Sequence, residues 1–226
     1  MGLYNYRSFP FLLFYYAVVM VYNLLTEGYI DAPDSFIHYY GILNNLFDAP
    51  LMLVFLTYFS PSIQLKKRMK WLAILFMLFE VVIIGIYGFT LKAITIVMGP
   101  GILLVLAFTL PFFVRQSKIT ITNHKATGKA MMTAALLFAY GCYSIIYIMY
   151  YLMDFHDVQN TFLVYFFVSS LSSVLICGGI IIEKKRIRKL SELMVVRREL
   201  SELYKQDKKT GPFRPALFDY DKDGWS

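Results

Sequence analysis

The chain has 226 residues, of which 58% are hydrophobic and 16% are charged, and its formal net charge is +7. Soluble domains carry about 25% charged residues, so this composition excludes an ordinary soluble domain and indicates an integral membrane protein. The positive charge is explained by membrane topology and by attraction to anionic lipid, and it gives no support to nucleic-acid binding.

The sequence predicts six membrane-spanning helices, because a span needs about 20 mostly apolar residues. The first stretch lacks a small-residue cleavage site, so we interpret it as a retained helix and not as a secretory signal. The six stretches are roughly 9–26, 36–59, 70–91, 93–114, 130–153 and 160–182. The expected fold class is therefore all-α: a polytopic, six-helix transmembrane bundle over residues 1–182.

The distribution of basic residues predicts the orientation of this bundle. With the N-terminus in the cytoplasm, Lys92 is the only Lys or Arg that falls outside. This arrangement follows the positive-inside rule and predicts that both termini are cytoplasmic, in a bacterial-type inner membrane or a plasma membrane. The two outer loops then carry acidic residues, namely Glu27, Asp31, Asp34, Asp154 and Asp157.

Residues 183–207 predict an amphipathic cytoplasmic helix, because their apolar residues recur every three or four positions. Three uses stay open for this helix: binding the membrane surface, forming a homodimer, or transmitting a signal to a partner. Residues 208–226 are polar and contain Gly211, Pro212 and Pro215, which predicts a flexible tail.

Two carboxylates, Asp48 and Glu80, lie near the middle of apolar stretches with no basic residue beside them. A carboxylate at membrane depth is costly, so it usually serves a function or a buried hydrogen bond. Both acids are 16 residues from Gln64, at the centre of the basic loop that joins the two stretches. In a helical hairpin they would meet near one depth and favour a shared proton or a bound cation. We expect Asp48 to be the acceptor and Glu80 its coupled partner.

Other polar side chains predict the rest of this site. His38, Asn45 and Asp48 share one helical face, Asn44 adds an amide one turn before the acid, and we expect His38 at the outer mouth. In the fifth span, Tyr140, Ser144 and Tyr147 align and indicate an aromatic pocket or hydrogen-bond donors for the acids. The alternative is that these groups only bond neighbouring helices together.

The fourth span contains Gly99, Pro100 and Gly101, which predict a kink or hinge, because proline removes a backbone hydrogen bond. A simple packing kink and a broken helix that lines a cavity are both compatible with this pattern.

The sequence therefore favours a transporter-like protein that binds or translocates a small ligand, ion or proton at a site built on Asp48 and Glu80. The alternative is a membrane sensor or adaptor that binds an apolar ligand in the aromatic pocket and signals through residues 183–207. No metal-binding or catalytic motif occurs, and no cofactor is identified. An enzyme is thus less favoured, although the two acids could act as an acid and base pair. The expected partners are membrane lipid and the small ligand, ion or proton.

Overall fold

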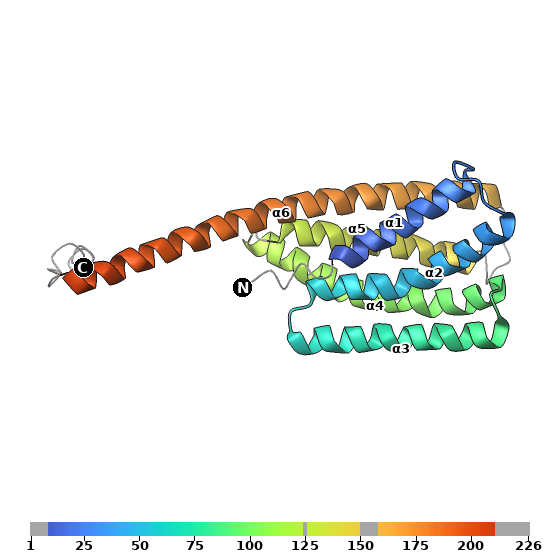
Figure 1. The fold of residues 1–226 in the computed structure, drawn as a ribbon, viewed down its shortest axis with the longest axis horizontal. Helices are drawn as coiled ribbons and strands as arrows, with labels where there is room; N and C mark the ends of the chain where they lie inside the picture. Colours follow the sequence, from blue (N-terminus) through green and yellow to red (C-terminus); the bar gives the residue numbers. More distant parts are fainter. Residues whose placement is uncertain (1–8, 124–125, 150–157, 211–226) are drawn as a thin grey trace. The chain divides into compact units, whose positions relative to one another are not determined.

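The computed structural model describes residues 9–123, 126–149 and 158–210, and no strand occurs among them. The elements shown in Figure 1 are α1 (Phe9–Thr26), α2 (Asp34–Leu56), the 3-10 turn η2 (Thr57–Phe59), α3 (Ile63–Tyr87), α4 (Leu91–Asn123), α5 (Thr127–Tyr147) and α6 (Val158–Thr210). Within the described residues, six helices are long and apolar enough to cross a membrane. The predicted all-α, multi-pass architecture is confirmed at this level.

Contacts divide the chain into two compact units, Met1–Ile180 and Ile181–Ser226. In the first unit, α2 is central because it contacts α1, α3 and α4, and α4 in turn contacts α5. The most completely buried side chains of α2, Leu53, Phe55 and Leu56, lie near its C-terminal end. This end of the bundle is therefore the most tightly packed part of α2.

Small residues let the helices of the first unit approach closely. A Cβ added at Gly41 would lie 3.0 Å from the Tyr22 ring, and one at Gly179 would lie 2.9 Å from the backbone oxygen of Gly128. Membrane helices commonly associate in this way, since lipid supplies no hydrophobic driving force between them. The glycines thus join α1 to α2 and α5 to α6.

Several predicted boundaries differ from the structure. The basic residues after position 60 lie in the first turns of α3, which begins at Ile63 after the cap formed by Ser62, whose Oγ accepts a hydrogen bond from the amide of Leu65 at 3.1 Å. α4 likewise continues to Asn123 through residues expected in a loop. Lysine and arginine are good helix formers with long stems, so they extend a helix past its apolar core. The expected loop acids Asp154 and Asp157 lie outside the described residues.

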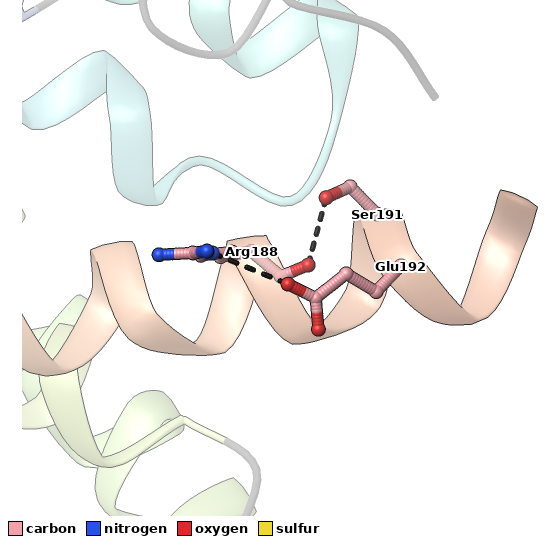
Figure 2. Close-up of polar contacts among 3 residues, drawn as sticks. All are labelled: Arg188, Ser191 and Glu192. Carbon is pink, nitrogen blue, oxygen red and sulfur yellow. Dashed lines mark hydrogen bonds and ion pairs between the residues drawn. The ribbon is translucent and has the colours of Figure 1, made fainter.

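α6 continues without interruption from the sixth predicted span to Thr210. In its second part a short motif repeats at 188–192 and 198–202: Arg188 Nε bonds Glu192 Oε1 at 3.2 Å and Ser191 Oγ donates to the Arg188 carbonyl at 2.7 Å, as Figure 2 shows. The second copy has the same contacts, at 3.3 and 2.7 Å. Exposed pairs at this spacing add about 0.2–0.5 kcal/mol each to a helix. The rest of the predicted tail, 211–226, lies outside the described residues.

Candidate functional site

Asp48 lies on α2 and is held by tyrosine side chains from two other helices. The hydroxyl of Tyr140, on α5, donates a hydrogen bond of 2.7 Å to Asp48 Oδ1. The side chain of Tyr15, on α1, also interacts favourably with the same carboxylate. Hydroxyl-to-carboxylate bonds of this length are among the stronger hydrogen bonds in proteins. Asp48 is therefore fixed in position by α1 and α5.

A cluster of five tyrosines surrounds this carboxylate. Their rings contact one another within and between helices: Tyr140 and Tyr143 have centroids 5.7 Å apart, and Tyr143 and Tyr165 have centroids 5.1 Å apart. The tyrosine cluster also interacts electrostatically with Asp48, and its members are Tyr15 and Tyr16 of α1, Tyr140 and Tyr143 of α5, and Tyr165 of α6. Aromatic rings with polar tips suit this position, since they fill space and supply donors at once.

Glu80, on α3, has a different environment. Its side chain is only 5% exposed, and among the described residues its Oε1 has no hydrogen-bond partner. The side-chain oxygen of Asn44, on α2, is buried in the same way without a partner among the described residues. Glu80 also interacts electrostatically with Asp48. Two buried acceptors thus lack a donor, which is a costly arrangement.

A shared neighbour on α4 connects the segments that carry the two acids. A Cβ built on Gly101 would lie 3.0 Å from Ala49 Cβ and 3.2 Å from Phe76 Cζ, so both side chains reach the same point of α4. Asp48 directly precedes Ala49 on α2, and Glu80 lies one helical turn after Phe76 on α3. The turn between the two helices lies at residues 60–62, before the expected centre at Gln64, so Glu80 is farther from the turn than Asp48 is.

The other predicted site residues do not gather at one point. Asn45 is exposed, and its amide donates to the Gly41 carbonyl of its own helix at 3.0 Å. His38 is exposed about 15 Å from Asp48 along α2, where its ring contacts Tyr39. Ser144 is half-buried one turn after Tyr140. The structure therefore brings together Asp48 and Tyr140, and places Glu80 and Asn44 close by.

The predicted hinge is part of a continuous helix. α4 passes through Gly99, Pro100 and Gly101 without a break, and both glycines are close packing points. The Tyr147 hydroxyl lies 2.8 Å from the position of a Cβ at Gly99, and it donates to the Thr95 carbonyl at 2.9 Å. Tyr147 thus joins α5 to α4. Movement at this segment stays a prediction.

Sequence reasoning assigned no site role to Tyr15 or Tyr16, although they complete the tyrosine cluster. The available signal was a pair of adjacent tyrosines inside an apolar span, because each buried hydroxyl needs a polar partner. That signal does not identify the hydrogen-bond partner of each hydroxyl, because the sequence of one helix does not show which other helix packs against it.

Among the described residues, no group of three or more His, Cys, Asp or Glu side chains is placed to hold a metal ion. Comparison with protein-family models, curated proteins and solved structures gives no match to this chain.

Proposed function

We propose that this protein binds or translocates a small ligand, ion or proton at a polar site formed by Asp48, Glu80 and Asn44. The observation that carries the proposal is Glu80, which is 5% exposed and whose Oε1 has no partner in the described part of the chain. An unpaired acceptor at membrane depth is expensive, and a ligand that supplies a proton or positive charge would offset this cost.

The electrostatics of the site favour a positively charged or hydrogen-bond-donating ligand. In the described part of the chain, the groups that interact with Asp48 and Glu80 are tyrosines and the acids themselves, with no basic side chain among them. The nearest basic residues in sequence are Lys66 for Asp48 and Lys70 for Glu80. The site thus offers acceptors and negative charge, and the positive charge would come from the ligand.

We further propose that both termini are cytoplasmic, in a plasma membrane or a bacterial-type inner membrane. The start of α3, the end of α4 and the start of α5 carry most of the basic residues of the bundle, and successive antiparallel helices bring these ends to one side. This clustering supports the positive-inside orientation. Cysteines introduced at Gln64 and Glu27, in a chain whose Cys142 and Cys177 are replaced by serine, test it with a membrane-impermeant thiol reagent in intact cells. Labelling at Glu27 alone supports the orientation, and labelling at Gln64 alone reverses it.

Ion flux into liposomes tests the function directly. Purified protein is reconstituted with internal dyes for pH and for sodium, beside the variants Glu80→Gln and Asp48→Asn, with folding checked for each. We expect flux in the wild type, loss in Glu80→Gln and a reduction in Asp48→Asn. Liposomes that stay tight with folded wild-type protein would count against translocation and would favour the sensor alternative. That alternative then predicts ligand-dependent stabilisation without flux.

A further inference from the structure

The two acids of the site differ in how many of their oxygen atoms are already engaged. We infer that Glu80, and not Asp48, is the acid that contacts the ligand, and that the ligand is a small monovalent cation. This inference rests on the proposed function and deepens it. It also reverses the roles that the sequence indicated for the two residues.

Asp48 is poorly suited to release and rebind a ligand. Its carboxylate already accepts a hydrogen bond from Tyr140 of α5 and interacts with the Tyr15 side chain of α1. A cation that bound there would compete with two tyrosines that already offset the negative charge. Asp48 is therefore a positioning residue that holds α1, α2 and α5 together and contributes negative charge to the site.

Glu80 instead belongs to a set of oxygen atoms that lack donors. Asn44 lies one helical turn before Asp48 on α2, and its Oδ1 is also buried without a partner among the described residues. Pro50 has no N–H, so the carbonyl of Leu46 lacks its usual helical donor. Pro100 has the same effect on Ile96 of α4, a helix that touches α2 at Ala49 and Gly101. We name these four groups, which come from α2, α3 and α4, the oxygen layer: Asn44, Leu46, Glu80 and Ile96.

The composition of the oxygen layer indicates the charge of its ligand. It offers one carboxylate, one amide oxygen and two backbone carbonyls, which are hard oxygen donors. Calcium takes six to eight oxygens and magnesium keeps several waters in a rigid octahedron, so both are poorly served by one carboxylate in a dry layer. A monovalent cation such as sodium matches the charge of Glu80.

Thermal unfolding in detergent tests the inference without requiring transport. Melting temperatures of the full chain are measured in sodium, lithium, potassium and N-methylglucamine chloride at equal ionic strength. We expect one of the inorganic cations to raise the wild-type melting temperature by about 5–10 °C at a hundredfold excess over Kd. The shift should vanish in Glu80→Gln and should persist in Asp48→Asn, or in Tyr140→Phe if the first variant does not fold.

The adjacent asparagines provide a matched control. Asn44→Ala should weaken the cation response by about tenfold in half-saturating concentration, because a buried ligand oxygen is lost. Asn45→Ala should leave it unchanged, because that side chain is exposed and bonds its own helix. An equal response in both asparagine variants would place the cation elsewhere and overturn the inference.

Failure of this inference can be told apart from failure of the proposed function. A wild type without any cation-specific shift, but with proton flux in liposomes that Glu80→Gln abolishes, overturns the monovalent-cation assignment and leaves the proposed function standing. A shift that is lost in Asp48→Asn and kept in Glu80→Gln overturns the assignment of roles. Folded protein with neither a shift nor flux overturns both.

Discussion

Asp48 and Glu80 carry the same chemical group in one bundle, yet their surroundings are opposite. Asp48 receives a hydrogen bond from Tyr140 and interacts with Tyr15, whereas an oxygen of Glu80, which is 5% exposed, has no partner among the described residues. A buried polar group that is satisfied stabilises a fold, and one that is unsatisfied destabilises it. The contrast teaches that hydrogen-bond partners separate a structural carboxylate from one free to bind a ligand.

The largest effect expected from this contrast is a difference in sign between two apolar substitutions. Asp48→Leu should destabilise the protein by about 3 kcal/mol, because the buried Tyr140 hydroxyl loses its acceptor. Glu80→Met should stabilise it by about 1–2 kcal/mol, because an unpaired polar group is replaced by an apolar one of similar length. Melting temperatures in detergent without added inorganic cation measure both. Destabilisation of similar size in both variants would remove the contrast.

The next largest effect concerns the tyrosine that fixes Asp48. Tyr140→Phe should cost about 2 kcal/mol, since it removes a hydrogen bond to a charged group from a side chain that is 2% exposed. Tyr39→Phe, on an exposed ring, is the control and should change little. In a double-mutant cycle, Tyr140→Phe combined with Asp48→Asn should cost less than the sum of the two single changes. Strict additivity would mean that the two side chains are not energetically coupled.

A smaller effect is expected where α4 touches α2 and α3 beside the oxygen layer. Gly101→Ala should cost about 1–2 kcal/mol, because its Cβ would come within 3.0 Å of Ala49 and 3.2 Å of the Phe76 ring. Gly85→Ala on α3 has nothing within 4 Å and should instead stabilise that helix by about 0.5–1 kcal/mol. Equal changes at both glycines would show that the close contact at Gly101 does not limit packing.

The smallest effect is expected at a hydrogen bond that joins α6 to α5, the helix that carries Tyr140. Ser172 Oγ donates to the Ala135 carbonyl at 3.1 Å, and the serine is 4% exposed. Ser172→Ala should lower stability by about 0.6 kcal/mol, the average for such bonds between membrane helices. Tyr140→Phe should therefore be several times more costly. If Ser172→Ala lowers stability more than Tyr140→Phe does, the packing of α6 against α5 stabilises the tyrosine cluster more than the Tyr140 hydroxyl does.

The number of long apolar helices was predictable from sequence, because each span of about 20 apolar residues is a local feature. The ends of the helices were less predictable. The polarity of Lys66 and Arg115 suggests loops, but Lys66 lies within α3 and Arg115 lies within α4. Length and apolar content therefore located the helices better than they located their ends.

The candidate site was predictable only in part, for a physical reason. Asp48 and Glu80 are conspicuous because acids in apolar stretches are costly. Which of them is satisfied depends on Tyr15 and Tyr140, which are 33 and 92 residues from Asp48 in sequence and meet it only through tertiary packing. Asn44 and Asn45 are adjacent and chemically identical, and only the packing of α2 distinguishes Asn44, whose Oδ1 is buried, from the exposed Asn45.

The most direct test of the central claim is a cation-induced infrared difference spectrum of the carboxyl groups in wild type, Glu80→Gln and Asp48→Asn. If Glu80 is the acid that contacts the ligand, adding the stabilising cation should change a carboxyl band that is absent in Glu80→Gln and retained in Asp48→Asn. A band that disappears in Asp48→Asn and remains in Glu80→Gln would contradict the account.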